Sequence, residues 1–530
     1  MNYIKNIRTM KKISIILFIA GIALSSCNSL IENPNASISA DQFYKTQADA
    51  VSAVTAVYST LDSDPASDFP IYGRNLNLLI GNGSDDQIYA PSNTNPDVRA
   101  LGTATYITSN DRVHKIWIQH YYGINRANIA IDNIAKIPLT QFSDTTVRSR
   151  LIRESKFIRG LLYFNLVRLH GGVPLVLHDP TTVDVNQLLI GRTSKDSIYQ
   201  QIISDLTDAT NLPATYTGSN IGRVTGGAAH ALLAKVYVTR KDWANAQVEL
   251  KKVITTGTFA GATGNYNYDL IPTFSQVFNP NYKNGVEHIF SAQFGTGAAR
   301  STNTLSSANF SSFNPSIYPG DIPADSTLFQ LFDASDARRS TTFFSSLFNS
   351  ATGKTVVFST PANSRFAKFI DFTISPLTSQ SLSKVNFPVI RYAEVLLLYG
   401  EVLNELNGGP TADAYKAINL VRARAHGLYT GNGVSTATTF DLTSGLNQAD
   451  FRDAVFLERR KEFIQEAQRW FDLVRRGVNS TTGNSYLIDA LKKLPGKTGA
   501  FVPTANRDTL YPIPQTEIDL NSKLTQNPGW

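Results

Sequence analysis

Acidic and basic side chains are concentrated near the end of the chain, at a spacing typical of one side of a helix. Glu462 and Glu466 are one turn apart, and Arg469, Asp472 and Arg476 continue the pattern in steps of three and four residues. Carboxylates at this spacing can act as general acid and base, or they can form ion pairs with the arginines. Because charges of both signs alternate here, we interpret the cluster as a structural ion-pair network rather than a catalytic centre.

The element that must position these charges is a helix with an apolar side. Its apolar positions recur at helical spacing, at Ile464, Ala467, Phe471 and Val474. Gly477 follows the last of them, where glycine commonly ends a helix. The pattern therefore predicts one partly buried helix that ends at Gly477.

Other reactive residue types do not form a recognisable catalytic motif. The sequence has no phosphate-binding Gly-x-x-x-x-Gly-Lys loop, no Gly-x-Ser-x-Gly element and no His-Glu-x-x-His motif. His114 and His120 do not have the i, i+4 spacing of two ligands on one helical face. We predict a protein that is not an enzyme and needs no cofactor. A glycan hydrolase is the alternative, because its two opposed carboxylates need not form a linear motif.

A calcium loop is suggested only weakly, by the three aspartates Asp62, Asp64 and Asp68. Gly73 stands where such a loop needs a bidentate carboxylate. We therefore predict no metal site.

The N-terminus has the pattern of a bacterial lipoprotein signal. Lys11 and Lys12 precede an apolar segment at residues 13–24, which is too short to span a membrane comfortably. Leu24-Ser25-Ser26-Cys27 resembles a lipobox, so we expect residues 1–26 to be removed and Cys27 to receive lipid (palmitate). Ordinary secretion with an incidental cysteine is the alternative. Cys27 is the single cysteine, so no intramolecular disulfide can form.

The charge of the chain argues against nucleic acid as a partner. The formal net charge is +7, but four of the 49 basic residues lie in the N-terminal segment, which leaves 45 against 42 acidic residues. No later block of basic residues persists, and nucleic-acid binding proteins usually have one.

Two segments read as helical hairpins. Residues 225–256 and 391–425 each contain two apolar-periodic runs with alternating small and large side chains, which resembles tetratricopeptide packing. Trp117, at helical spacing with Val113 and Tyr121, is interpreted as a core residue. Between the helical parts lie two irregular regions, from Asp62 to about Asp111 and from Gly257 to about Ser383. Loops of this length are usually functional or disordered, and short alternating runs in the second suggest small strands.

Several blocks resemble the SusD/RagB family of nutrient-binding lipoproteins. They are Glu458-Arg459-Arg460 with Glu462, Glu466, Arg469, Asp472-Leu473, Arg475 and Gly477; residues 153–175 with Trp117-Ile118 and Asn125-Arg126-Ala127-Asn128; Asp333 with Asp336-Ala337-Arg338-Arg339; and the tail from Tyr511 to Trp530. The resemblance implies a mostly α SusD-like fold with tetratricopeptide-like hairpins and a loop-rich side with short β-strands. A chain that ends on tryptophan is also expected to dock its terminus.

The same resemblance implies a function at the outer membrane. We expect the protein to be lipid-anchored, to face the cell exterior, to bind an oligosaccharide and to pass it to a SusC-like TonB-dependent β-barrel. A peptide is the alternative cargo, because RagB-like relatives imply one. A protein-interaction scaffold that uses the hairpins is a further alternative. We expect residues 27–530 to form one body, with intertwined parts at about 27–320 and 321–530.

Candidate ligand contacts come from the two irregular regions. Aromatic rings can stack on the C–H faces of sugars while charged groups bond the hydroxyls. The candidates are Tyr72, Arg74, Asp85, Asp86, Tyr89, Phe313 and Tyr318. Loop packing for the aromatic residues and solvated charge for the others is the simpler interpretation.

Overall fold

The structure is a computed structural model, and we describe the part of the chain that it places. The described residues are 43–63, 69–90, 93–180, 184–295, 303–311, 321–344, 346–349, 353–357, 364–374, 383–433, 438–494 and 507–530. The chain forms two units, Met1–Lys45 and Thr46–Trp530, and every element below lies in the second. The predicted signal peptide at residues 1–26 and Cys27 lie outside the described residues.

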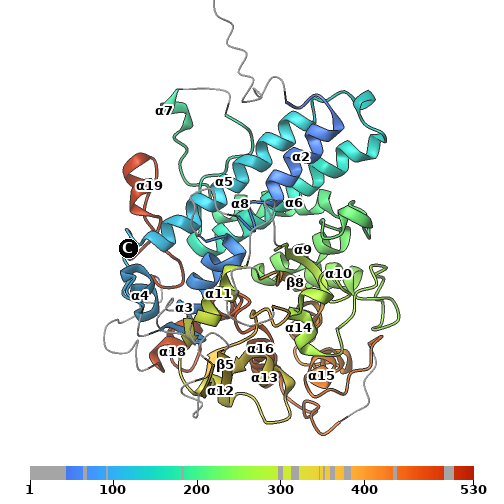
Figure 1. Ribbon diagram of the computed structural model, residues 1–530, viewed down its shortest axis with the longest axis vertical. Coiled ribbons are helices and arrows are strands. Elements are labelled where there is room, and N and C mark those ends of the chain that lie inside the picture. Colours follow the sequence, from blue (N-terminus) through green and yellow to red (C-terminus); the bar gives the residue numbers. More distant parts are fainter. Residues whose placement is uncertain are drawn as a thin grey trace, which may run out of the picture. The chain divides into compact units, whose positions relative to one another are not determined.

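Helices make up most of the second unit, which confirms the predicted mostly α fold (Figure 1). The α-helices are α2 (Gln47–Tyr58), α3 (Leu76–Asn82), α4 (Pro96–Thr103), α5 (Asp111–Ile134), α6 (Thr145–His170), α7 (Val185–Leu188), α8 (Lys195–Ala209), α9 (Gly226–Arg240), α10 (Trp243–Val253), α11 (Thr304–Ser311), α12 (Thr327–Gln330), α13 (Ala337–Thr342), α14 (Tyr392–Leu406), α15 (Ala412–Ala425), α16 (Gln448–Phe463), α17 (Arg469–Arg476), α18 (Tyr486–Lys492) and α19 (Gln515–Leu520). Shorter helical turns are the π-helix η1 (Ile71–Asn75) and the 3-10 helices η2 (Leu139–Gln141), η3 (Gly218–Asn220), η4 (Phe274–Phe278) and η5 (Pro280–Tyr282).

A bundle of long helices holds the N-terminal half together. α2, α5 and α6 pack side by side, and α8 packs on α6 (Figure 1). α2 begins with a capping box, in which Thr46 and Asp49 each accept a hydrogen bond from the other's backbone N–H. α6 ends at Gly171, whose φ of 76° few other residues adopt. Trp117 is buried, which confirms its predicted place in the core.

Both predicted hairpins are present. α9 pairs with α10, α14 pairs with α15, and α14 also packs on α10. The small residues of α9 explain this close packing: Ala228, Ala229 and Ala234 are fully buried. The antiparallel pair of β2 (His288–Ala292) and β8 (Phe387–Arg391) leads directly into α14.

The helix predicted to end at Gly477 is two helices. α16 ends at Phe463 and α17 begins at Arg469, so the prediction of one continuous helix is wrong. Gln465 (φ 67°) and Ala467 (φ 53°) adopt the left-handed conformation between them. The apolar stripe hides this break, because Ile464 and Ala467 are both buried although they lie within it. Gly477 ends α17 with a positive φ, as predicted.

The two irregular regions contain more regular structure than expected. The first holds η1, α3, β1 (Gln87–Tyr89) and α4, and the described part of the second holds five short helical elements and several strands. These strands are β3 (Asp321–Pro323), β4 (Phe343–Phe344), β5 (Ser346–Asn349), β6 (Lys354–Val357) and β7 (Arg365–Phe366). Among the described residues each sheet has two strands, in the pairs β1–β3, β2–β8, β4–β7 and β5–β6, all antiparallel. The pairs β1–β3 and β2–β8 each join a strand from the predicted N-terminal part to one from the predicted C-terminal part. The boundary between these parts near residue 320 stays a prediction.

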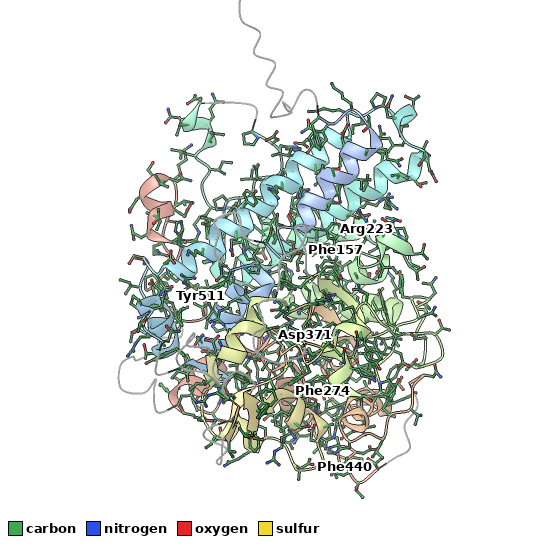
Figure 2. All side chains as sticks on the ribbon, in the orientation of Figure 1. Phe157, Arg223, Phe274, Asp371, Phe440 and Tyr511 are labelled. Carbon is green, nitrogen blue, oxygen red and sulfur yellow. The ribbon has the colours of Figure 1, made fainter. Side chains whose placement is uncertain are left out.

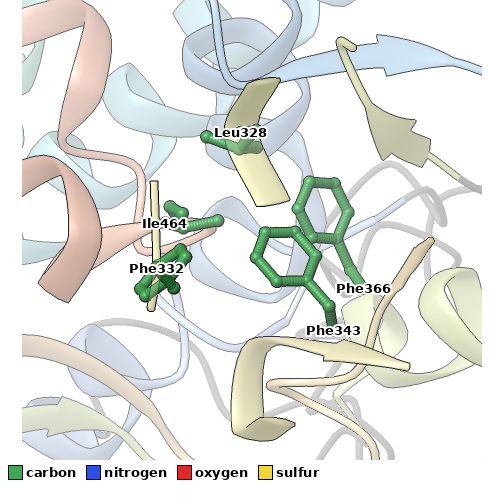
Figure 3. Packing of buried hydrophobic residues seen from close by; sticks show 5 residues of the cluster. All are labelled: Leu328, Phe332, Phe343, Phe366 and Ile464. Atoms are coloured by element: carbon green, nitrogen blue, oxygen red, sulfur yellow. The ribbon is translucent and has the colours of Figure 1, made fainter. Parts of the chain in front are cut away.

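The second irregular region contains most of a small hydrophobic core rich in phenylalanine (Figure 3). Its buried members are Leu328, Phe332, Phe343, Phe366 and Ile464. Phe343 and Phe366 stack with ring centres 5.7 Å apart. Since Ile464 comes from the α16–α17 break, this core ties the break to strands β4 and β7.

The C-terminal tail docks on the N-terminal bundle, as predicted. The Tyr511 backbone N–H donates to Leu169 O at 2.7 Å, and its hydroxyl donates to Leu79 O at 2.8 Å (Figure 2). The Trp530 indole N–H donates to the carbonyls of Arg507 (3.1 Å) and Leu510 (3.2 Å).

Candidate functional site

The charged cluster near the C-terminus is a buried structural network. Glu462 accepts hydrogen bonds from Arg338 at 3.0 Å, from Arg391 at 2.5 Å and from Arg424. All four side chains are at most 1% exposed. Burial alone would raise the pKa of Glu462, but the guanidiniums of Arg424, Arg391 and Arg338 hold it well below its ordinary value. A carboxylate bound by three arginines cannot exchange protons near neutral pH, which supports the structural interpretation.

The break between α16 and α17 aims a second carboxylate into the same network. Glu466 lies between the two left-handed residues Gln465 and Ala467. It accepts hydrogen bonds from Arg391 at 2.7 Å and from Lys368 at 2.8 Å. Burial lowers the pKa of Lys368 to about 8 despite this carboxylate. Because the chain bends here, Glu462 and Glu466 both accept hydrogen bonds from the same arginine, Arg391.

Asp85 and Asp86, two of the predicted ligand contacts, belong to the interior. Arg469 donates to Asp85 at 2.7 Å, and Arg460 donates to Asp86 at 2.8 Å. Burial raises the pKa of Asp85, but Arg469 and Arg460 outweigh it and hold that pKa well below the ordinary range. The expectation that these acids lie exposed on a loop is wrong, because α3 and β1 place them against α16 and α17. Their partners Arg460 and Arg469 belong to the C-terminal motif. Nothing in that motif indicates that these arginines bind Asp85 and Asp86.

Tyr72 and Arg74 are also buried, which agrees with packing for Tyr72 and contradicts a solvated charge for Arg74. The Tyr72 hydroxyl accepts a hydrogen bond from Asn165 Nδ2 at 3.0 Å, and its ring centre lies 5.7 Å from that of Phe387. Burial raises the pKa of Tyr72 to about 12. Both residues lie on the π-helix η1, which turns their side chains inward. Their contact with ligand stays a prediction, and their burial favours a structural role.

Arg74 nevertheless connects the two irregular regions. Its guanidinium forms an ion pair with Asp321 at 3.1 Å, and both side chains are at most 3% exposed. Asp321 begins β3 and is paired in register with Tyr89 at the end of β1. On its other side, Arg74 lies over the Phe69 ring at 5.4 Å. Arg74 thus contacts the half-buried Phe69, and its partner Asp321 is the strand partner of the half-buried Tyr89.

These two rings define the aromatic site, which consists of Phe69 and Tyr89. Arg99 lies over the Tyr89 ring at 5.1 Å. The ring also rests against Gly102, where a Cβ would come within 2.4 Å of it. Of the predicted contacts, Tyr89 is the one that the structure leaves partly accessible. Phe313 and Tyr318 lie outside the described residues, in the segment that precedes β3. Sequence reasoning missed Phe69, whose signal was an aromatic ring in a loop.

Two hollows lie elsewhere on the second unit. One of about 180 Å³ at the end of α2 is lined by Tyr58, Asp62, Arg223 and Gln293 among others. Another of about 390 Å³ lies between η4 and α13, with Phe274 and Phe278 in its floor and Phe372, 58% exposed, at its edge. Either offers polar groups beside apolar walls, which is a general property of ligand sites.

One group of possible metal ligands occurs among the described residues. Asp333, Asp336 and His426 offer ligand atoms within 4.8 Å of one another. Asp336, however, binds Arg338 at 2.7 Å, and His426 stacks on Phe440 with ring centres 3.7 Å apart. These contacts account for both side chains, so the geometry gives no support to a metal there. In the described part of the chain, no helix is both long and apolar enough to cross a membrane.

Comparison with known proteins finds similarity along nearly the whole chain. The SusD family model matches residues 345–530, and a second model, described as "Starch-binding associating with outer membrane", matches residues 74–238. SusD-like protein P2 of Formosa agariphila is 27% identical over 98% of this chain and 100% of its own length. A SusD homologue from Bacteroides thetaiotaomicron has a TM-score of 0.75 at 25% identity, covering 93% of this chain and 98% of that one.

A further solved structure matches in fold. It is surface glycan-binding protein A from Bacteroides thetaiotaomicron in complex with laminarihexaose, with a TM-score of 0.66 at 20% identity. The match covers 91% of this chain and 100% of that chain.

Proposed function

The chain belongs to the SusD/RagB family, and from this premise we propose that it binds an oligosaccharide at the outer-membrane surface without cleaving it. It then delivers this nutrient to a SusC-like TonB-dependent β-barrel. The glycan ligands named for its structural neighbours support this class of cargo. Lipid on Cys27 would hold the protein at the membrane, facing the exterior.

The observation that carries the proposal is the aromatic site around the Arg74–Asp321 ion pair. Phe69 and Tyr89 are half-buried, and an arginine lies over each ring, Arg74 over Phe69 and Arg99 over Tyr89. A sugar ring stacks on such a platform through its C–H groups, because burial of apolar area is favourable there. The guanidinium of Arg99, over the Tyr89 ring, supplies donors for hydroxyl groups. Phe313 and Tyr318 lie outside the described residues and stay candidate contacts from the sequence alone.

The experiment is calorimetry of the purified protein against neutral oligosaccharides and against peptides. We expect a glycan to bind, and we expect Phe69→Ala and Tyr89→Ala each to weaken it about tenfold, the loss of about 1.4 kcal/mol of stacking. Phe372→Ala is the matched control, because Phe372 is an exposed phenylalanine in another hollow. Unchanged affinity in both test variants would refute this site. Binding of peptides alone would favour the alternative cargo, and released products would reveal a hydrolase.

Delivery is tested separately by co-purification with SusC-like β-barrels from the same organism. We expect the barrel to be retained by the wild-type protein and by the Tyr89→Ala variant, because the aromatic site serves the cargo. Failure of the barrel to co-purify with either protein would contradict the delivery step without affecting the binding step.

A further inference from the structure

A cavity of about 360 Å³ opens between α6, α8, α9 and α17, and it has no lining residue in common with the aromatic site. Its walls include Arg168, Lys195, Tyr199, Lys235 and Phe471. Positive side chains outnumber the carboxylates that line it. The cavity is therefore a separate place to look for a ligand.

Arg168 is the cation at the centre of this argument. Its guanidinium lies between two aromatic rings, 3.8 Å from the centre of Phe164 and 3.7 Å from that of Phe471. Nε donates to Phe164 O at 3.0 Å and Nη2 donates to Asn165 Oδ1 at 2.8 Å, and both acceptors are neutral. Burial lowers the pKa of Arg168 to about 10. The rings hold the guanidinium in place, but they do not neutralise its charge.

The other buried cations of the cavity differ from Arg168, because each has its own carboxylate. Lys235 pairs with Glu394 at 2.9 Å, and Arg459 pairs with Asp472 at 2.9 Å. Within the described part of the chain, neither Arg168 nor the exposed Lys195 at the cavity forms an ion pair. Two positive charges at one cavity therefore have no carboxylate partner among the described residues. The protein has a lower effective dielectric constant than water, so these charges attract an anion more strongly than they would in water.

Tyr199 adds a neutral donor beside them. Its ring is buried at the wall of the cavity, and burial raises the pKa of its hydroxyl, which therefore stays protonated. No hydrogen bond from this hydroxyl to another described residue is found. A guanidinium, an ammonium and a hydroxyl, on three residues that line one cavity, are donors of the kind that the two oxygens of a carboxylate accept from.

We propose that this cavity binds the carboxylate of a small ligand through Arg168, with Lys195 and Tyr199 beside it. The carboxylate can belong to a uronic acid unit of an acidic oligosaccharide or to the C-terminus of a peptide. Arg168 has N–H groups left for such a bond, since five are present and two are engaged within the protein. This site goes beyond the proposed function, which concerns neutral sugar rings on the aromatic site.

The test measures binding of D-glucuronate and D-galacturonate to the detergent-solubilised full chain, with D-glucose and D-galactose as uncharged counterparts. A second arm compares a short peptide having a free C-terminus with the same peptide amidated. We expect at least one carboxylate probe to bind tenfold or more tightly than its neutral counterpart. The arm in which this occurs identifies the source of the carboxylate.

Three variants locate the binding. We expect Arg168→Gln to remove the preference for the charged probe, and Lys195→Gln, an exposed position that leaves the fold unaffected, to weaken it about threefold. Arg148→Gln is the matched control on the same helix, because Arg148 donates to the carbonyls of Ala135 and Ile137 and is remote from the cavity lining. If Arg168→Gln fails to fold, Lys195→Gln decides. Equal binding of charged and neutral probes overturns the proposal, and so does an unchanged preference in Lys195→Gln.

Discussion

At the scale of single residues, the charged side chains that the sequence singled out are buried and paired. Glu462 with three arginines, and Asp85 and Asp86 with Arg469 and Arg460, lie inside the molecule. Sequence reasoning identified the first group as structural because charges of both signs alternate around Glu462, although its three arginine partners lie 38, 71 and 124 residues away. It misjudged the aspartates because their partners are more than 370 residues away in the chain. Only the fold reveals such pairs.

Removal of one charge from the network should be costly. We expect Glu462→Gln to lower the free energy of unfolding by about 3–5 kcal/mol, because three buried arginines lose their shared carboxylate. Urea unfolding measures this loss. Asp196→Asn is the control, since Asp196 is 79% exposed in its pair with Arg240 and such a pair contributes less than about 1 kcal/mol. Similar losses in both variants would contradict the network's role.

Acid should destabilise the protein through Asp472. Burial alone raises the pKa of this carboxyl, but Arg459 and Arg475 lower it from 3.8 to about 2. Because the folded-state pKa is depressed, the stabilisation is complete above pH 3.8 and is lost as the pH falls towards 2. We expect the free energy of unfolding of Asp472→Asn to depend less on pH in this window, as measured by urea unfolding at several pH values. An identical slope in the wild-type protein would exclude this contribution.

At the scale of elements, hydrophobic periodicity predicted the long helices and both hairpins. Their apolar faces are regular because each packs against other helices along its length. Periodicity failed at the α16–α17 break, where Ile464 and Ala467 are buried by different neighbours although they keep helical spacing. It also failed on η1, α3 and α4, whose glycine- and asparagine-rich sequence looked irregular. The contacts that stabilise them come from distant strands and helices.

The left-handed residue at the break gives a prediction for glycine. Ala467 has a φ of 53°, a conformation that costs a side-chain-bearing residue about 1 kcal/mol. We expect Ala467→Gly to change the free energy of unfolding by less than about 0.5 kcal/mol, since relief of this cost offsets the loss of one methyl group. Ala56→Gly, within helix α2, should instead lose about 1 kcal/mol. Chemical denaturation compares the two, and an equal loss would mean that the break carries no backbone cost.

At the scale of the whole molecule, the fold class and the docked terminus were predictable, whereas the site was only partly so. The family blocks cover most of the chain and indicate the architecture. Of the predicted ligand contacts, Tyr89 is the one left partly accessible by the described structure, while Phe69 was missed. The exposure of these two aromatic side chains depends on how η1 and β1 pack relative to β3. No local pattern in the sequence encodes that relation.

The docked tail should contribute to global stability. Arg507 lies over the Trp530 ring at 4.2 Å, and the Tyr106 ring centre is 5.1 Å from that of Trp530. We expect Trp530→Ala to cost about 1–3 kcal/mol, less than for a fully buried tryptophan. Thermal unfolding measures the effect. Leu520→Ala, at a side chain that is 70% exposed, should leave the transition within error. A wild-type transition in Trp530→Ala would show that the tail is not part of the cooperative unit.

The docking of the tail also affects the order in which parts of the chain can fold. Asn527 donates hydrogen bonds to His170 O at 3.0 Å and to Tyr511 O at 2.8 Å, and Tyr511 bonds Leu169. The C-terminal carbonyls of α6 are thus satisfied by the segment from Tyr511 to Asn527. The last turn of α6 is therefore incomplete until this distant segment has docked. Two parts of the chain that are far apart in sequence must meet before the first bundle is finished.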